Sequence, residues 1–140
     1  MAETFRSVPQ MFLHRVGKTP DRDAFLFPDE NGWTPLTWRQ VGEKVKAIAC
    51  GLRALGLGDE ERASILSATR LDWILADLGI LAAGGATTTI YPSSTTPDCL
   101  FILQDSGTRL LLAESREQAD RIAAKRSEVP DVKAIVVFEG

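Results

Sequence analysis

Arg62–Pro92 reads RASILSATRLDWILADLGILAAGGATTTIYP and predicts a strand, a helix and a second strand. The run 62–67 is short and apolar, and the run 86–90 is rich in the β-branched residues that favour strands. The helix expected over 71–83 is apolar nearly all round, so it should be buried on several sides. Two strands joined through a helix lie parallel, and a parallel sheet needs helices on both of its faces.

The segment before this stretch predicts a helix over 8–16 followed by a hairpin. The hairpin strands are expected at 24–27 and 33–36, on either side of a loop rich in turn-forming residues. Thr37 and Gln40 then have the spacing of a capping box, which begins a helix. One side of that helix carries apolar residues at helical spacing, namely Val41, Val45, Ile48, Leu52 and Leu55.

The remainder of the chain continues the alternation of helices and strands. Pro97 is expected as the first residue of a helix. The apolar members of that helix are Leu100, Phe101 and Leu103. Strands over 109–113 and 134–137 flank a further helix over 114–127. The order β-α-β-α-β-α-β, after an N-terminal helix and a β-hairpin, predicts an α/β fold with a parallel sheet wrapped by helices.

We expect residues 1–140 to form a single N-terminal α/β (sub)domain that is a fragment of a larger protein. A chain of this length is about one domain and can bury a core without disulfides or metals. It stops at Gly140, just after an expected strand that a terminal helix would normally cover. Apolar surface left open where the missing part would pack predicts self-association of the fragment.

The composition is that of an ordinary globular protein with a small negative charge. The net charge of -3 and the pI of about 5.2 argue against nucleic acid or an anionic membrane as a partner. Cys50 and Cys99 lie in helical patterns without metal-ligand spacing, which predicts two buried free thiols in a reducing cytosol and no metal site. No signal peptide or membrane-spanning run is recognisable, so a cytoplasmic protein is expected.

Functional residues in a parallel sheet most often lie in the loops at the carboxyl ends of its strands. Three such loops are candidates here, at 67–69, 91–96 and 114–116. Ser67 and Thr69 could hold a phosphate at a helix N-terminus, and they serve equally as plain helix caps. The second loop offers hydroxyls, an aromatic face and a helix start, or is a structural turn. The third loop is either a polar site or a solvated helix start.

Other residues do not assemble into a catalytic group. His14, the only histidine, has no carboxylate or serine at a suggestive spacing, which favours a surface or core role. Asp72 and Asp77 do not share one helix face, so they do not form an acid/base pair. No dinucleotide fingerprint and no P-loop is present. The sequence therefore predicts no catalytic residue within these 140 positions.

Several phrases, taken in order, resemble the beginning of the AMP-forming acyl-CoA synthetases of the adenylate-forming superfamily. These phrases are Leu36–Trp38, Gly51–Gly56, Ile65–Trp73, Ala82–Gly84, Thr88–Pro92 and Ile102–Gly107. The Arg-x-Asp-Trp phrase at 70–73 and the Ile-Tyr-Pro-Ser phrase at 90–93 are most similar to the long-chain fatty-acid branch. The chain departs from the family at Glu60-Glu61, where Gly-Asp is usual, and at Thr89, where proline is common.

The resemblance implies an activity for the full-length enzyme and none for this fragment. A fatty acid and ATP, accompanied by Mg²⁺, form an acyl-adenylate and diphosphate, and coenzyme A (CoA) then displaces AMP to give acyl-CoA. The family's phosphate-handling loop, adenine-binding residues and catalytic lysine are expected beyond Gly140. We therefore expect the fragment to be inactive and to hold no ATP, Mg²⁺ or CoA by itself. An adenylating enzyme for another carboxylate is a near variant.

The resemblance also implies one contact site. In related acetyl-CoA synthetases the loop matching Tyr91–Ser93 lies near the nucleotide of CoA, and an aromatic ring beside main-chain groups suits an adenine face. Tyr91 and Ser93 are therefore the candidate CoA-contact residues.

Two alternatives come from other functional classes. A stand-alone flavodoxin-like domain that binds a nucleotide or flavin would use the 67–69 loop, although the usual Gly-Asn-Thr continuation is absent. A phosphoacceptor signalling domain needs acidic residues at the end of the first parallel strand, where Ser67 and Ala68 stand.

Overall fold

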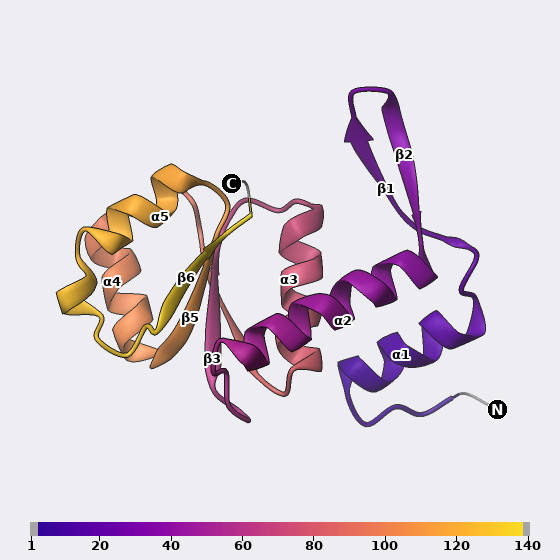
Figure 1. The fold of residues 1–140 in the computed structure, drawn as a ribbon, viewed down its shortest axis with the longest axis horizontal. Coiled ribbons are helices and arrows are strands. Elements are labelled where there is room, and N and C mark those ends of the chain that lie inside the picture. The colour runs from indigo at the N-terminus through magenta and orange to yellow at the C-terminus, as the bar shows by residue number, and fades with distance from the viewer. Residues whose placement is uncertain (1–2, 139–140) are drawn as a thin grey trace.

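The structure is a computed structural model that describes residues 3–138. Four parallel strands form one sheet in the order β4-β3-β5-β6, and two antiparallel strands form a separate hairpin. The elements, shown in Figure 1, are α1 (Val8–Lys18), β1 (Asp23–Asp29), β2 (Gly32–Thr37), α2 (Trp38–Ala54), β3 (Arg62–Leu66), α3 (Leu71–Ala82), β4 (Ala86–Ile90), α4 (Thr96–Asp105), β5 (Thr108–Ala113), α5 (Arg116–Ala123), the short 3-10 helix η1 (Arg126–Glu128) and β6 (Ala134–Val137). The predicted α/β fold and its order of elements are confirmed.

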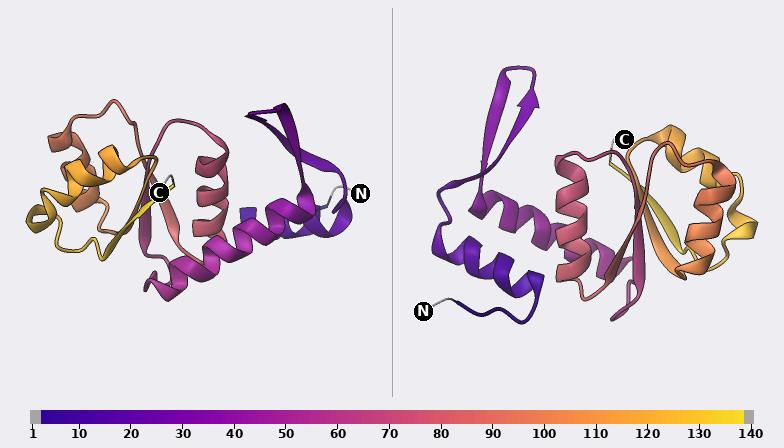
Figure 2. Two further views of the ribbon diagram at one scale, coloured as in Figure 1. Left: turned by 45° about the horizontal axis from the view of Figure 1, so that its top comes forward. Right: turned by 180° about the vertical axis from the view of Figure 1, so that it is seen from behind.

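The parallel sheet is the middle of three layers. Helices α2 and α3 cover one face, and α4 and α5 cover the other (Figures 1 and 2). Alternate residues of a strand point to opposite faces, so Ala63 and Ile65 of β3 pack toward α2 and α3, whereas Leu66 packs toward α4 and α5. Each face therefore has its own apolar core, as a sheet wrapped on both sides requires.

Helix α3 is buried on more than one side, as its apolar sequence predicts. Its buried residues are Leu75, Ala76, Gly79 and Ile80. Ala76 and Ile80 belong to the core against the sheet, whereas Leu75 belongs to a third cluster formed with α1, α2 and the hairpin. The helix ends at Ala82, and Gly84, just beyond the C-cap Ala83, has a φ of 84° in the left-handed region that glycine tolerates best.

The N-terminal helix, the hairpin and the capping box also follow the prediction. The Thr37 side chain accepts a hydrogen bond from the Gln40 amide, and the Gln40 side chain accepts one from the Thr37 amide. The hairpin strands are longer than expected, because their ladder runs from the Asp23–Thr37 pair at the base to the Asp29–Gly32 pair at the turn. The hairpin stands away from the sheet and reaches the rest of the chain through its base (Figures 1 and 2).

Several predicted positions are corrected by the structure. Helix α4 begins at Thr96, with Thr95 as its N-cap, so Pro97 is not its first residue. The helix expected over 114–127 is only Arg116–Ala123, because the chain turns into η1 before Pro130. Leu55 and Phe101, expected among the apolar core residues of their helices, are 45% and 66% exposed.

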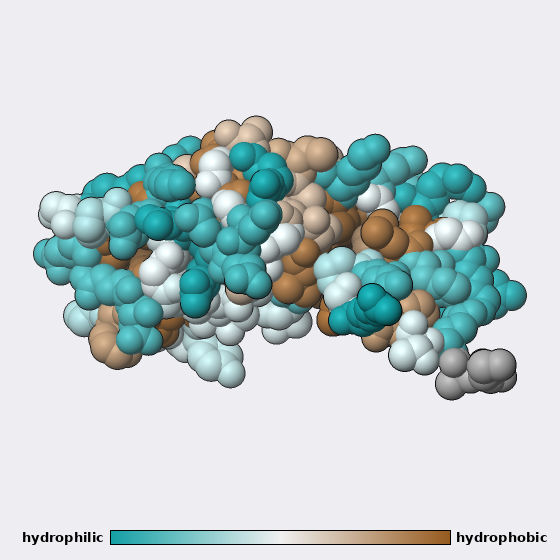
Figure 3. Space-filling view, turned by 90° about the horizontal axis from the view of Figure 1, so that it is seen from below, coloured by the Kyte–Doolittle hydropathy of each residue, from teal (hydrophilic) through white to brown (hydrophobic). Residues whose placement is uncertain are grey.

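The two cysteines differ in burial, which corrects the expectation of a buried pair. Both are free, but Cys99 is one of the buried residues of α4, whereas Cys50 is exposed. Cys50 lies away from the buried stripe of α2 and lines an open groove between α1 and α2. The face seen from below in Figure 3 has apolar patches among hydrophilic residues. Self-association of the chain remains a prediction.

The turn before β3 closes in spite of its two glutamates. Glu60 has a φ of 59°, and its amide donates to the Gly84 carbonyl at 2.8 Å. The Glu61 carboxylate accepts from the Gly58 amide at 2.8 Å, and this bond holds the pKa of Glu61 below its usual value. Glu60 therefore adopts the left-handed conformation that glycine favours, and β3 stays in place in spite of the departure from Gly-Asp.

The close approach of α2 and α3 gives a test of the packing. A Cβ added at Gly79 would lie 2.9 Å from Ile48 Cβ, whereas one added at Gly51, on the neighbouring helix, would meet nothing within 4 Å. We expect Gly79→Ala to lower the free energy of unfolding by about 1–3 kcal/mol through overpacking. Gly51→Ala is the control and should raise that free energy by about 0.5–1 kcal/mol. Urea denaturation measures both, and equal effects would contradict the helix contact.

Candidate functional site

The carboxyl ends of β3 and β4 bring two of the predicted loops together. These strands are neighbours in parallel register, with Leu66 opposite Ile90. A cavity of about 220 Å³ lies between the loops that follow them. It is lined by Ser67, Ala68, Thr69, Trp73, Thr89, Ile90, Tyr91 and Pro92. The position agrees with the general preference of parallel sheets for sites at this edge.

The third loop joins the first one through Glu114. Its amide donates to the Leu66 carbonyl at 3.0 Å, which continues the pairing of β5 with β3. Its carboxylate then accepts a hydrogen bond from the Ala68 amide at 2.7 Å. Sequence reasoning treated residue 114 as a helix start and missed this bond, which depends on the strand order. All three predicted loops therefore lie side by side.

The expectation that Ser67 or Thr69 caps α3 is wrong. The N-cap position is Arg70, and its side chain makes no capping bond. Ser67 instead donates to the Ala68 carbonyl at 2.8 Å. The Glu114 carboxylate already uses the Ala68 amide, and its negative charge would repel a phosphate there. The 67–69 loop is therefore poorly suited to the phosphate-binding role that a flavodoxin-like domain would give it.

The loop after β4 presents an aromatic ring to solvent. Tyr91 is 81% exposed, and Ser93 is exposed beside it. The Ser94 amide donates to the Tyr91 carbonyl at 3.0 Å, which closes a tight turn. Thr95 then caps α4 by accepting from the Asp98 amide at 3.3 Å. The ring is consequently held on a short, ordered loop at the rim of the cavity.

Helix α5 contributes two residues to this loop that sequence reasoning did not single out. Gln118 donates to the Pro92 carbonyl at 3.2 Å, and Arg121 donates to the Ser94 carbonyl at 2.8 Å. Their spacing of three residues puts them on one side of the helix, but only the strand order shows that this side faces the loop.

The remaining candidates are structural or peripheral. His14 Nε2 lies 2.9 Å from a Glu3 carboxylate oxygen on α1's side of the molecule. Asp72 pairs with Arg70 at 2.8 Å. Among residues 3–138 no group of three or more histidine, cysteine, aspartate or glutamate side chains is arranged to hold a metal ion. Within the same residues, no helix combines the length and the hydropathy that crossing a bilayer requires.

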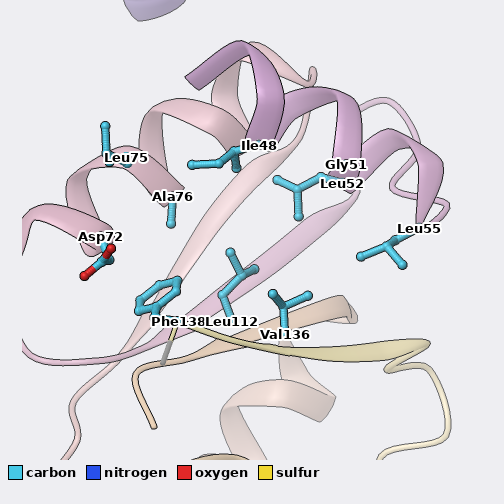
Figure 4. Close-up of a pocket in the computed structure, with 10 residues that line it drawn as sticks. All are labelled: Ile48, Gly51, Leu52, Leu55, Asp72, Leu75, Ala76, Leu112, Val136 and Phe138. Atoms are coloured by element: carbon cyan, nitrogen blue, oxygen red, sulfur yellow. The ribbon is translucent and has the colours of Figure 1, made fainter. Parts of the chain in front are cut away.

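A second cavity of about 220 Å³ lies on the face of the sheet covered by α2 and α3, between these helices and the strands β5 and β6 (Figure 4). Its lining is apolar except for Asp72, which stands at one end of the cavity in Figure 4. Leu112, Val136 and Phe138 form its floor on the sheet. An apolar lining with one ion-paired carboxylate supplies neither a nucleophile nor a base, so this cavity is not a candidate catalytic site.

The Glu114 bond gives a test of the loop arrangement. We expect Glu114→Ala to speed hydrogen exchange of the Ala68 amide and to lower the free energy of unfolding by about 0.5–1 kcal/mol, because solvent replaces one acceptor. Glu114→Gln keeps an acceptor oxygen and should have a smaller effect on both. Amide exchange followed by NMR measures the first quantity and urea denaturation the second. Unchanged exchange at Ala68 in Glu114→Ala would contradict the bond.

Comparison with known proteins identifies the family. Residues 12–140 match the model of the AMP-binding enzymes. A long-chain-fatty-acid–CoA ligase, FadD15 of Mycobacterium bovis, is 34% identical over 96% of this chain and 22% of its own length. Tyrocidine synthase 3 of Brevibacillus parabrevis is 31% identical over 90% of this chain and 2% of its own. The chain thus spans about a fifth of the FadD15 protein.

A solved structure confirms the same fold. The anthranilate CoA ligase AuaEII, in complex with anthranoyl-AMP, superposes with a TM-score of 0.85 over 98% of this chain and 26% of its own, at 22% identity. The family match, which covers nearly the whole chain, and the shared fold lead to one conclusion. The chain belongs to the AMP-binding enzyme family.

Proposed function

We propose that the chain is the N-terminal part of an ATP-dependent, AMP-forming long-chain fatty-acid–CoA ligase. The observation that carries this proposal is the 34% identity to FadD15 over 96% of the chain, within the family match. The proposed architecture is a single N-terminal α/β (sub)domain of a longer enzyme. The match to about a fifth of FadD15 supports this reading, because the rest of such an enzyme would supply the remaining parts of the site.

The proposed reaction has two steps. A carboxylate oxygen of the fatty acid attacks the α-phosphorus of ATP, and diphosphate leaves with the acyl-adenylate still bound. The sulfur of CoA then attacks the acyl carbon, and AMP leaves as the thioester forms. Mg²⁺ would accompany ATP as its counter-ion. The proposed location is the cytoplasm, in keeping with two free cysteines.

We assign Tyr91 and Ser93 as the CoA-contact residues of this enzyme. The ring of Tyr91 is 81% exposed and is free to stack on a base, and aromatic stacking tolerates any purine face. The Ser93 hydroxyl is exposed next to it and can donate or accept a hydrogen bond. No residue between 3 and 138 is assigned a catalytic role.

A second candidate, from the same family, is an enzyme that adenylates another carboxylate. Tyrocidine synthase 3 matches the chain at 31% identity, close to the 34% of FadD15. Sequence identity alone therefore does little to decide between fatty acids and other carboxylates as the substrate. Substrate profiling separates them directly. Adenylation of amino or aryl acids, with none of fatty acids, would favour this second candidate.

The test of the proposed function uses the full gene product that contains these residues. With ATP, Mg²⁺, CoA and palmitate, we expect release of AMP and formation of palmitoyl-CoA, both followed by chromatography. Residues 1–140 alone should release no AMP under the same conditions. Absence of AMP release from the full gene product with every fatty acid tried would overturn the proposal.

A variant tests the proposed coenzyme contact. Tyr91→Ala should raise the KM for CoA about tenfold, because one aromatic–base stack is lost, and should leave ATP–diphosphate exchange unchanged. Tyr91→Phe keeps the ring and should resemble the unmodified enzyme. Phe101→Ala removes an exposed ring from α4 and is the matched control. An equal rise in KM for both alanine variants would exclude a specific role for Tyr91.

A further inference from the structure

We propose that Gln118 and Arg121 of α5 are positioning residues that hold the loop after β4 in place and so determine where Tyr91 is presented. Both side chains donate to main-chain carbonyls of this loop. Gln118 Nε2 lies 3.2 Å from the Pro92 oxygen, and an Nη atom of Arg121 lies 2.8 Å from the Ser94 oxygen. We call the set of these two donors the α5 latch.

Helix α5, which carries both donors of the α5 latch, is itself held in place by packing and by an N-cap. Ala119 and Ile122, on the same helix, are buried, and Ile122 packs in the core between the sheet and α4. The Ser115 side chain caps the helix by accepting from the Gln118 amide at 3.3 Å. The backbone of α5 is fixed by its buried face and by its cap. Side chains that extend from a fixed backbone can restrict the motion of the loop that they bond.

Arg121 also ties the loop to α4. A second Nη atom lies 3.4 Å from the sulfur of Cys99, and that sulfur lies 3.8 Å from the Ser94 carbonyl oxygen. Cys99 is fully buried, and burial raises the pKa of its thiol while the Arg121 charge acts in the opposite direction. The guanidinium thus lies between the loop and the first turns of α4, where it covers the thiol.

The consequence for catalysis rests on the proposed function, in which Tyr91 contacts CoA. Release of the latch would let the loop move and would weaken CoA binding. The adenylation step does not involve CoA, so it should be unaffected. A positioning role therefore predicts a change that is confined to the KM for CoA.

The first experiment measures loop opening without reference to activity. The full gene product and its variants are treated with iodoacetamide, and alkylation of the Cys99 peptide is followed by mass spectrometry. We expect Arg121→Ala to speed Cys99 alkylation roughly tenfold, because local opening becomes easier when a charged hydrogen bond is lost. The exposed Cys50 should react at an unchanged rate and is the internal reference.

The direction of this effect distinguishes opening from simple electrostatics. Loss of the Arg121 charge alone would raise the thiol pKa further, lower the thiolate fraction and slow alkylation. Faster alkylation in Arg121→Ala therefore reports access to the thiol. Because the Arg121 side chain itself covers the thiol, the same direction in Gln118→Leu, whose hydrogen bond is to Pro92, is what assigns that access to movement of the loop. Lys125→Ala removes an equal charge just beyond α5 from a side chain that pairs with Glu128, and it should leave the Cys99 rate unchanged.

Gln118→Leu keeps the proposal testable if Arg121→Ala does not fold. It preserves side-chain size and removes one donor, so we expect about a threefold faster alkylation of Cys99. Unchanged Cys99 rates in the folded latch variants would overturn the proposal, as would an equal acceleration in Lys125→Ala.

The second experiment measures steady-state kinetics of the same variants. The latch variants should raise the KM for CoA several-fold with ATP–diphosphate exchange unchanged. An equal loss of exchange would show a general structural defect and count against a positioning role. If the unmodified enzyme shows no exchange at all, the proposed function fails, whereas the alkylation result still decides whether the latch holds the loop.

Discussion

The fold depends on the pairing of β3 with parallel strands on both of its edges. Parallel neighbours cannot be joined by a tight turn, so the chain must cross over the sheet in a helix between each pair of strands. With β4 on one side and β5 on the other, β3 is left with four of its five residues buried. The positions of α3 and α4, and of every loop at the carboxyl edge, follow from this one arrangement.

The central strand also contains a polar residue that the core must accommodate. The hydroxyls of Ser64 and Thr108 lie 2.6 Å apart, and both residues are fully buried. Thr108 is in turn 2.7 Å from the Ser106 hydroxyl, which donates to the Ile102 carbonyl. Each of these three hydroxyls therefore has a partner, and the short chain of bonds links β3, β5 and the end of α4.

Elements with strong local signals could be predicted from the sequence. The capping box at Thr37, the glycine after α3 and the apolar periodicities all act within a few residues, so periodicity and capping rules find them. Exposure was harder to predict. Cys50 and Phe101 both lie in helices with an apolar side, and the sequence predicted that both would be buried. Only the packing of the neighbouring elements shows that they are exposed.

The placement of the three candidate loops was predicted from the sequence, whereas the bonds that connect these loops were missed, and both outcomes have the same cause. Parallel topology alone places the three loops at one edge, so they could be found before the structure was known. The bonds from Glu114, Gln118 and Arg121 join residues that are 26–46 positions apart in the chain. Such contacts depend on which strands are neighbours and how α5 is rotated, and no local pattern encodes either property.

Glu60 shows how a non-glycine residue can be kept in a turn that favours glycine. A side chain with a Cβ costs about 1–2 kcal/mol in the left-handed region, and the turn is held nevertheless by its bond to Gly84 and by the ladder of β3. Glu60→Gly would therefore remove this cost and raise the free energy of unfolding. A background carrying glycine there would tolerate damaging substitutions elsewhere in the domain, which makes residue 60 a useful starting point for mutational scanning.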